Sequence, residues 1–549
     1  MDFNKDVLYF IPLGGSNEIG MNLNLYGFNN NWIIVDMGIM FAGDEFPGID
    51  VILPDTFFID SITANIKAIF ITHSHEDHIG GLQYLFNKFN CPIYLTDFAK
   101  KVLEFKVRHT DCDEGLFLKE VHYQKPISVG PFEVIYGAIT HSVPESSILS
   151  ISVGNKLIVH SGDWKIDQKP LVGDKTDTKF LKKLSKKGVD VLVCDSTNIF
   201  NSKPSGSEYD VRKNLLEIIK KSKSNRVFVT TFASNIARLS TLIYIAENLK
   251  IKICFIGGSL NRSFDIARSC GYLSKSPNQI NFNNIPEKEK TIIVCTGCQG
   301  EPRAALSQIA YDFHKIKLKD NDLVIFSSKI IPGNEKKLYK LHNQLVKDGI
   351  EVISEETEFI HVSGHPNRED LKDMYQWVKP KCVIPVHGEH RHMIEHINFA
   401  KEMQVPHPVQ VENGDIVKLY PGEVPEVYDK APSGRLYLDG NVSVEEDSQS
   451  IKDRRNLSSN GYLEVTILIT PKGNIHNNPV TTFRGLPIYE KDEFIYGLED
   501  EIEKTTRAFK LGNKQQESNL IDALKIACRK FTKEKTGKRP YTNINLVRI

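Results

Sequence analysis

The sequence lacks the features of a membrane or secreted protein. Its 549 residues contain no apolar run of about 20 residues, the length needed to span a bilayer. The first residues also lack the basic-then-apolar order of a secretory signal. Nine cysteines are few for so long a chain and indicate no disulfide framework. We therefore expect a reduced, soluble protein of the cytoplasm.

An excess charge of one sign is also absent. Lysine plus arginine and aspartate plus glutamate both number 69. No overall field therefore attracts a polyanion, and any nucleic-acid surface must be local. Cys295 and Cys298 have the C-x-x-C spacing of redox or zinc sites, but no second such pair completes a four-cysteine zinc site. We expect this pair to be structural.

The chain is too long for one hydrophobic core. Up to about residue 200 it reads as short apolar strands with few helices, near 82–90, 97–107 and 178–187, which predicts sheets with helices outside. From about 206 to 360 strands and helices alternate, as in a parallel α/β domain. A strand at 382–386 then returns to the first domain, so the second domain is expected to be an insertion. The sequence pattern of the remaining C-terminal part predicts a linker rich in proline and glycine, followed by a small α+β module.

Three histidines and an aspartate lie within six residues, directly after the apolar run 68–71. In this H-x-H-x-D-H pattern, His73 and His75 share one face of extended backbone, and Asp77 and His78 open the next turn. A strand that ends in such a turn can direct all four side chains into one hole. A lone histidine is rarely a ligand, but this set of imidazole and carboxylate groups predicts a site for divalent cations.

A pair of cations needs more ligands, usually including a carboxylate that bridges them about 3.5 to 4 Å apart. Asp163 follows an apolar strand and a glycine turn, and it is the candidate bridge. His141, His160 and His387 each follow a strand as well. The residues alone do not decide between His141 and His160, and either could be purely structural. A further histidine cluster is expected on a solvated helix face: His390, His392 and His396.

The order of these motifs resembles a known family. Residues 72–78, His141 and Asp163 are similar to the signature of the metallo-β-lactamase fold, and Asp195, His365 and His387 to three motifs of its β-CASP nucleic-acid-processing branch. The resemblance narrows to bacterial ribonuclease J through four segments: GGSNEIGMN at 14–22, FASN at 232–235, TGCQGEP at 296–302 and IPGNE at 331–335. It is strong over about 7–440 and loose in the tail.

The resemblance implies an α/β fold, a metallo-β-lactamase αββα sandwich with an inserted β-CASP α/β domain and a small α+β C-terminal domain. The implied domains are 1–205 and 363–425 for the two parts of the metallo-β-lactamase domain, 206–362 for the β-CASP domain, 426–460 for a linker and 461–549 for the C-terminal domain.

The resemblance also implies the roles of the candidate residues. Asp36 would support the site, His365 would be the general acid, and Asp195 would fix the tautomer of that histidine. Alternatively, the His365–Asp195 pair merely ties the two domains together. The implied metal ligands are His73, His75 and His141 for one cation, Asp77, His78 and His387 for the other, with Asp163 bridging.

The implied RNA channel would grip a 5′-terminal monophosphate through small-residue turns whose backbone N–H groups suit phosphate oxygens. Its residues would be Phe232, Ala233, Ser234, His361, Val362, Ser363, Gly364 and His365. Asn367 stands where many members have serine, with Arg368 beside it, which leaves selectivity for the monophosphate open. Asp50 and Asp439 resemble positions that hold a structural divalent cation in some relatives, although aspartates in turns are usually turn formers.

The leading hypothesis is a metal-dependent ribonuclease that hydrolyses RNA phosphodiester bonds. The family acts as a 5′-to-3′ exonuclease with endonuclease activity, in maturation of RNA, including ribosomal RNA, and in mRNA decay. The resemblance implies two divalent cations, Zn²⁺ or Mn²⁺. It also implies that the chain forms a homodimer or homotetramer through the C-terminal domain. The alternatives are a β-CASP nuclease acting on DNA and an inactive RNA-binding scaffold, but a scaffold should have lost ligands, and here every ligand position is filled.

Overall fold

The computed structural model describes residues 3–108, 115–274, 276, 278–421, 424–471, 474–509 and 514–549. Its contacts divide it into two compact units, Met1–Met40 with Leu53–Gly434, and Phe41–Ile52 with Arg435–Ile549. Within the described ranges, no helix is both long and apolar enough to cross a membrane.

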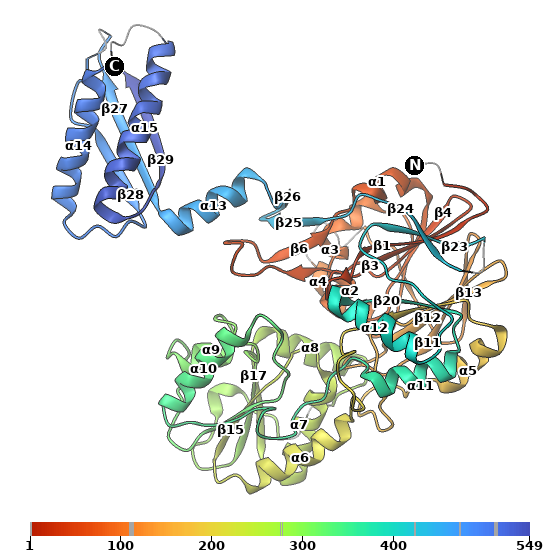
Figure 1. Ribbon diagram of the computed structural model, residues 1–549. Coiled ribbons are helices and arrows are strands. Elements are labelled where there is room, and N and C mark those ends of the chain that lie inside the picture. Colours follow the sequence, from red (N-terminus) through yellow and green to blue (C-terminus); the bar gives the residue numbers. More distant parts are fainter. Residues whose placement is uncertain are drawn as a thin grey trace. The chain divides into compact units, whose positions relative to one another are not determined.

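The first unit contains two large sheets (Figure 1). Their facing apolar side chains form one core, which includes Phe10, Phe70, Tyr136 and Ile384. One sheet has the strand order β24-β23-β1-β3-β4-β7-β8-β9. Its strands are β1 (Leu8–Gly14), β3 (Leu23–Phe28), β4 (Asn31–Val35), β7 (Ile66–Phe70), β8 (Ile93–Leu95), β9 (Leu118–Glu120), β23 (Asp415–Tyr420) and β24 (Glu426–Lys430). The helices between them are α1 (Phe57–Ile62), α2 (Glu76–Ile79), α3 (Leu82–Leu85) and α4 (Asp97–Val107), with short 3₁₀ turns at η1 (Thr63–Asn65) and η2 (Phe86–Lys88).

The other sheet has the order β10-β11-β12-β13-β14-β20-β22, and α5, α11 and α12 pack on its outer face. Its strands are β10 (Pro126–Val129), β11 (Phe132–Ala138), β12 (Ser147–Val153), β13 (Lys156–His160), β14 (Val191–Asp195), β20 (Cys382–Val386) and β22 (His407–Pro408). The three helices are α5 (Thr178–Lys187), α11 (Arg368–Val378) and α12 (His390–Glu402), and a short pair is formed by β2 (Ser16–Asn17) and β21 (Gly388–Glu389).

Strands β14 and β20 are parallel neighbours although a long stretch of chain separates them, with Val191 opposite Cys382 and Asp195 opposite Val386. The chain leaves the sheet at the end of β14 and returns at β20. The inserted domain predicted from the sequence is therefore confirmed as an excursion between two adjacent strands. The boundary numbers given for the domains stay predictions.

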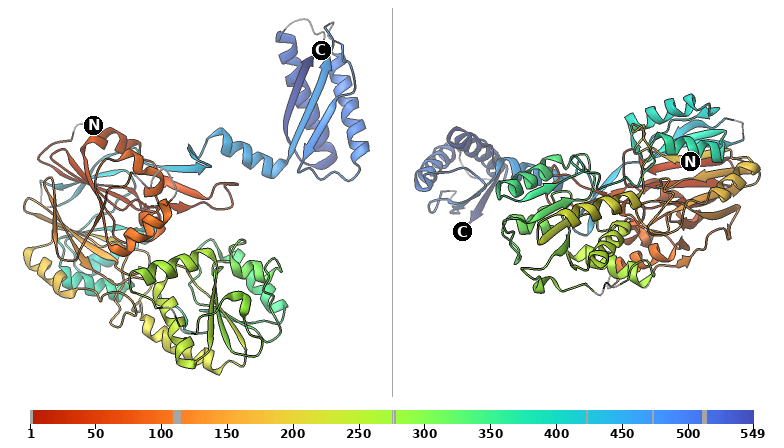
Figure 2. Two further views of the ribbon diagram at one scale, coloured as in Figure 1. Left: turned by 180° about the vertical axis from the view of Figure 1, so that it is seen from behind. Right: turned by 90° about the horizontal axis from the view of Figure 1, so that it is seen from below.

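The inserted domain is a parallel five-stranded sheet in the order β16-β17-β15-β18-β19, with helices on both faces (Figure 2). Helices α6, α7 and α8 pack on one face, and α9 and α10 on the other. The strands are β15 (Arg226–Thr230), β16 (Lys252–Ile256), β17 (Thr291–Cys295), β18 (Leu323–Phe326) and β19 (Glu351–Ile353). The helices are α6 (Glu208–Lys221), α7 (Ile236–Leu249), α8 (Gly258–Ser269), α9 (Ala305–Ala310) and α10 (Glu335–Lys347), with the 3₁₀ turn η3 (Phe282–Asn284).

Two further sheets are small. The first, in the order β26-β25-β6-β5, is formed by β5 (Met40–Phe41), β6 (Val51–Pro54), β25 (Arg435–Asp439) and β26 (Val442–Glu445). Helix α13 (Gln449–Asn460) follows. The second has the order β28-β27-β29, and two helices pack on one of its faces, which confirms the predicted α+β module. Its elements are β27 (Tyr462–Ile469), β28 (Val480–Arg484), β29 (Tyr541–Arg548), α14 (Lys491–Arg507) and α15 (Lys514–Thr536).

Candidate metal centre

The H-x-H-x-D-H segment leaves the end of β7 and turns into helix α2. His75 is extended, with φ −68° and ψ 151°, and the helix begins at the next residue. The turn is held against a neighbouring loop because Asn22 N donates to Asp77 O and Met37 N donates to His78 O. A Cβ at Gly38 would lie 1.7 Å from Asp77 O, so this close approach requires glycine there.

A first group of side chains brings together three imidazoles and one carboxylate. His73 Nε2 lies 3.1 Å from His75 Nδ1, which lies 3.1 Å from His141 Nε2. Asp163 Oδ2 is 3.8 Å from both His73 Nε2 and His141 Nε2. His75 and His141 thus join the set although they are 66 residues apart.

A second group shares Asp163. His78 Nε2 lies 3.2 Å from Asp163 Oδ1 and 3.6 Å from Asp77 Oδ2. His387 Nε2 lies 3.6 Å from Asp77 Oδ2 and 3.5 Å from Asp163 Oδ2. In each group one potential ligand atom per residue lies within 4.8 Å of all the others. The carboxylate of Asp163 is the one member common to both.

The chemistry of this donor set fits divalent cations. Burial lowers the pKa of His73 and of His141 well below the usual range, so both rings are neutral, as metal ligands must be. Burial would raise the pKa of Asp163, but His387, His78 and His365 hold it well below the usual range, so the carboxylate is ionised. Asp163 Oδ1 is buried and has no hydrogen-bond partner among the described residues. A buried acceptor without a donor suits a cation.

Neighbouring groups fix which nitrogen of each ring faces the centre. Asp36 Oδ2 accepts from His78 Nδ1 at 2.7 Å, which leaves Nε2 free to act as a ligand. Burial opposes the charge of His78, yet the carboxylates of Asp163, Asp77 and Asp36 raise its pKa well above the usual range, so a cation that binds there would displace the proton from Nε2. His141 Nδ1 lies 2.6 Å from Gly364 O, which likewise leaves its Nε2 to face Asp163.

His160 is not part of the centre. Its Nδ1 lies 2.9 Å from Tyr26 Oη, and it ends strand β13 inside the core. The structure therefore brings His141, rather than His160, next to the other histidines. Asn22, whose contribution could not be recognised from the sequence, contacts two rings: its Nδ2 is 3.0 Å from His78 Nε2 and 3.0 Å from His387 Nδ1.

His365 and Asp195 lie at the edge of this centre. His365 Nδ1 is 2.8 Å from Asp195 Oδ2 and 3.8 Å from Asp163 Oδ2. Burial would lower the pKa of His365, but Asp195 and Asp163 together raise it to about 9. The His365 side chain is 23% exposed whereas Asp195 is fully buried. The His365 ring is thus protonated at neutral pH and partly open to solvent.

The predicted RNA-binding residues belong to two segments, 232–234 and 361–365. Phe232, Ala233 and Ser234 follow β15, and Ser234 lines a groove of about 360 Å³ together with His75. In the second segment, Ser363 Oγ and His365 O accept from Asn198 Nδ2 at 2.7 Å and 3.3 Å. Asn198 is a further contributor that the sequence reading missed.

Two departures from the family pattern have structural roles here. Asn367 stands just before α11, where its backbone N–H donates to Asp370 Oδ2 at 2.9 Å. Arg368 pairs with Glu395 and lies over the ring of Phe399. Neither observation favours a phosphate contact by these two side chains.

The expectation of a solvated histidine face was wrong for two of the three residues. His390 is exposed, but His392 and His396 are buried. His396 Nδ1 lies 2.8 Å from Ser196 Oγ and its Nε2 lies 2.6 Å from Tyr375 Oη, so hydrogen bonds replace solvent. None of the three belongs to a group of potential ligands among the described residues.

The remaining predicted sites lie apart from the centre. In the second unit, Asp439 Oδ1 accepts from Arg454 Nη2 at 2.5 Å, and Asp50 is exposed. The structural cation there stays a prediction. Cys295 and Cys298 are buried free thiols, and burial raises the pKa of Cys298 to about 12.

Comparison with known proteins supplies matches along most of the chain. Family models match as "Metallo-beta-lactamase superfamily" at residues 29–166, "Ribonuclease J, beta-CASP domain" at 224–345, "Zn-dependent metallo-hydrolase RNA specificity domain" at 349–409 and "Ribonuclease J C-terminal domain" at 449–549.

Named relatives match nearly the whole chain. Ribonuclease J of Sinorhizobium meliloti is 36% identical over 552 residues, which is 99% of this chain and 97% of that protein. Ribonuclease J2 of Bacillus subtilis is 32% identical over 546 residues, 98% of each. A solved structure of a protein of unknown function from Enterococcus faecalis matches with a TM-score of 0.52 and 16% identity over 75% of this chain and 100% of that one, which shows the fold alone.

Fold and site together define a hydrolase of the metallo-β-lactamase fold, with an inserted β-CASP domain and a buried group of histidines and aspartates suited to metal ions. The chain belongs to the ribonuclease J family and is a hydrolase that acts on RNA. The fold class, family and enzyme class predicted from the sequence are confirmed.

Proposed function

We propose that the chain holds two divalent cations and hydrolyses RNA phosphodiester bonds as a 5′-to-3′ exonuclease that also cleaves internally, in RNA maturation and mRNA decay. His73, His75 and His141 would hold one cation, and Asp77, His78 and His387 the other, with Asp163 shared. When bound, such a pair lowers the pKa of water and offsets the charge that develops on phosphate oxygens. The observation that carries the proposal is Asp163, whose carboxylate belongs to both ligand groups.

His365 is the proposed general acid. Its pKa of about 9 keeps the ring protonated at neutral pH, so that it can give a proton to the departing 3′-oxygen. Asp195, fully buried at the end of β14, receives Nδ1–H and directs Nε2 away from itself. A positioned acid of this kind contributes about 10² to 10⁴ in rate. The neighbouring Nδ1–Asp163 distance of 3.8 Å supports a position beside the reacting phosphate.

The groove beside His75 supports a path for single-stranded RNA into this centre. It is lined by Ser74, His75 and Ser234, with the cations of Lys106 and Arg262 in the same wall. Backbone N–H groups of Phe232, Ala233 and Ser234, and of residues 361–365, would hold the 5′-phosphate. Lys106 pairs with Glu76 in the same wall, so Arg262, which forms no ion pair with a described carboxylate, is the basic side chain that suits a polyanionic strand.

The test uses RNA labelled at the 3′ end and carrying either a 5′-monophosphate or a 5′-triphosphate, with Mn²⁺ or Zn²⁺ added. Faster decay of the monophosphorylated substrate, with mononucleotides as products, is the expected result. Asp77→Ala should abolish hydrolysis, and Asp373→Ala on helix α11 is the control. Equal decay of both substrates would remove the end-selective pocket, and undiminished cleavage by Asp77→Ala would remove the two-cation mechanism.

Other features stay predictions from the sequence. Zn²⁺ and Mn²⁺ both accept this mixed set of ligands, so the donor set does not choose between them. A homodimer or homotetramer through the C-terminal domain, a structural cation at Asp50 and Asp439, and a cytoplasmic location rest on the family resemblance and on composition. Sedimentation of the full chain and metal analysis would test the first two.

A further inference from the structure

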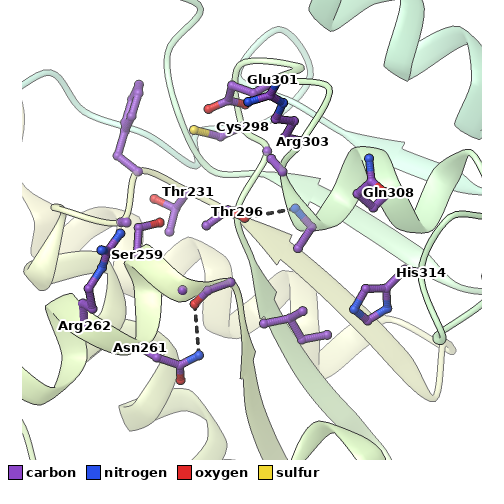
Figure 3. A pocket seen from close by; sticks show the side chains of 18 of the residues that line it. Thr231, Ser259, Asn261, Arg262, Thr296, Cys298, Glu301, Arg303, Gln308 and His314 are labelled. Atoms are coloured by element: carbon purple, nitrogen blue, oxygen red, sulfur yellow. Dashed lines mark hydrogen bonds between the residues drawn. The ribbon is translucent and has the colours of Figure 1, made fainter. Parts of the chain in front are cut away.

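The cavity of the inserted domain in Figure 3, of about 730 Å³, is part of the RNA channel already proposed. Phe232 and Ala233 line it, and it shares Ser259 and Arg262 with the groove beside His75. A different cavity, of about 830 Å³, lies in the second of the two units. None of the proposed metal ligands and none of the predicted RNA-binding residues lines it. It is therefore a separate candidate site.

Three elements of the second unit surround this cavity. Helices α13 and α15 form two of its walls, and the residues that open strand β29 form the third. The end of α13 is tied to the start of β29 by two hydrogen bonds. Tyr541 N donates to Gly461 O at 2.9 Å. Lys538 Nζ donates to Ser459 O at 2.9 Å. The walls of the cavity are thus held together within one compact unit.

The lining of the cavity is cationic. Lys533 lies four residues after Arg529 and three after Lys530, so these three cations share one face of α15. Arg539 adds a fourth cation from the start of β29. All four side chains are exposed, and none forms an ion pair with a described carboxylate. The single carboxylate in the lining is that of Glu534. Positive charge from two different elements therefore converges on one concave surface.

Such a cluster is more than an ordinary solvated helix face. Like charges four residues apart, as Arg529 and Lys533 are, destabilise a helix. Elsewhere in the same unit cations have acidic partners: Lys504 pairs with Asp500, and Arg548 pairs with Glu517. The whole chain is also balanced, with 69 lysines and arginines against 69 aspartates and glutamates. The cavity thus carries a local excess of positive charge, which suits a polyanion.

Aromatic and apolar side chains stand among these cations. Tyr541 lines the cavity and is 36% exposed. Its ring stacks on that of Tyr462 on the neighbouring strand, with 6.3 Å between the centroids and 20° between the planes. Ile526, which is 69% exposed, lines the wall formed by α15. Unpaired bases stack on aromatic side chains, whereas the bases of a duplex are not free to do so. The combination of cations with an aromatic platform therefore favours a single strand.

We propose that this cavity binds single-stranded RNA, with phosphates along Arg529, Lys530 and Lys533 and a base against Tyr541. The chain acts on RNA, so a polyanionic single strand is a ligand that it meets in its own reaction. The cavity gives a bound strand a point of attachment other than the metal centre. Binding needs neither metal nor cleavage, so the inference does not depend on the proposed function.

Photo-crosslinking of the full-length protein locates the bound strand. The probe is a 2′-O-methyl oligouridine with photoreactive 4-thiouracil bases and a length of about 12 nucleotides, within the usual range of single-strand sites, about 4 to 16. Mass spectrometry should identify a crosslinked peptide that contains Tyr541, and a duplex of the same probe should crosslink there less. Absence of crosslinks from residues 526–541 would overturn the inference. Equal crosslinking of the duplex would overturn the assignment to single strands.

A double replacement measures the electrostatic contribution. The Kd is obtained from the yield of the Tyr541 crosslink as the concentration of the probe rises. Lys530→Gln with Lys533→Gln removes two proposed phosphate contacts, so the slope of log Kd against log salt concentration should fall by about 1.4, at about 0.7 per contact to a single strand. At about 0.1 M salt this change corresponds to about 25-fold weaker binding.

The matched control removes the same charge from the same unit outside the cavity. Lys491→Gln with Lys514→Gln should bind the probe as the wild type does, since neither lysine lines the cavity. An equal loss of affinity in both double variants would show an effect of net charge alone and would overturn the inference.

A contact between copies of the chain is the competing use of this surface. Sedimentation of Lys530→Gln with Lys533→Gln distinguishes the two uses, because a surface for RNA leaves the mass of the wild-type assembly unchanged. If this variant lowers that mass while crosslinking to RNA stays at the wild-type level, the cavity belongs to an interface between copies and the inference is overturned.

Discussion

Replacement of Asp36 by asparagine should weaken metal binding without removing any proposed ligand. Asp36 Oδ1 accepts from Thr72 N at 2.8 Å, and its Oδ2 accepts from Thr72 Oγ1 at 2.8 Å and from His78 Nδ1 at 2.7 Å. Its backbone φ is +63°, a conformation that asparagine also tolerates. Asp36→Asn therefore keeps the shape and the backbone while changing one acceptor into a donor.

The magnitude follows from the tautomer of His78. With an amide NH₂ in place of Oδ2, the Nδ1–H of His78 would face a donor, so the ring would place its proton on Nε2 instead. Nε2 is the atom 3.2 Å from Asp163, and once protonated it cannot bind a cation. Loss of an orienting partner of this kind typically costs about 10- to 100-fold in metal affinity or activity, or about 1.4 to 2.7 kcal/mol.

Metal affinity is measured by competition with a chromophoric chelator at pH 7.5, and RNA hydrolysis is followed as the metal concentration is raised. We expect the activity curve of Asp36→Asn to shift to about 10- to 100-fold higher metal concentration. Asp60→Asn is the control, since Asp60 is exposed and pairs with Lys88 in the same domain. Wild-type metal affinity and activity in Asp36→Asn would refute the role assigned to Asp36 and the orientation of His78.

Other predictions concern the general acid and the buried polar groups. Asp195→Asn should lower the hydrolysis rate about 10²- to 10⁴-fold while metal content, measured by mass spectrometry, stays unchanged; loss of metal would contradict this. Arg238 pairs with Glu208 at 3.0 Å, so Arg238→Met leaves the Glu208 carboxylate buried and unpaired. This replacement should lower the free energy of unfolding of the inserted domain, measured by hydrogen exchange, by about 3 to 5 kcal/mol. The double replacement with Glu208→Leu should recover most of this loss. Burial lowers the pKa of His396 to about 4, so the contribution of the neutral ring to stability is complete above pH 6.5 and is lost as pH falls through 4. In urea denaturation, His396→Gln should reduce the fall of the free energy of unfolding over this range by up to about 1.4 kcal/mol per pH unit.

The local parts of the centre could be read from the sequence because they depend on neighbouring residues. The spacing from His73 to His78 is enough to divide four side chains between two groups, since alternation in extended backbone and the start of a helix are local properties. The helices expected at 97–107 and 178–187 coincide with α4 and α5 for the same reason. The helix expected at 82–90 is shorter, because α3 ends at Leu85 and continues as a 3₁₀ turn.

The choice between His141 and His160 could not be made locally. Both lie near the ends of apolar strands, and only the pairing of β12 with β13, which sets His160 opposite Leu149, and the contact with Tyr26 direct His160 into the core. The burial of His396 has a similar cause. Its two partners are Ser196, directly after β14, and Tyr375 in α11, and a hydropathy pattern cannot identify a polar side chain whose buried surroundings supply hydrogen bonds.

The position of the proposed general acid depends on the inserted domain, whereas the proposed metal ligands do not. All seven ligands precede the insertion or follow its return, and β14 and β20 pair directly. His365 instead lies on the returning segment, where Ile360 O accepts from Arg238 Nη1 at 2.9 Å and Gly364 O contacts His141. Loosening of the inserted domain would therefore release His365 and remove the contact of Gly364 O with His141, while the other six proposed ligands keep their places. Under the proposed mechanism, the same tie would make the two domains one catalytic unit, because proton transfer from His365 would require the strand end at Asp195 and the returning segment to meet.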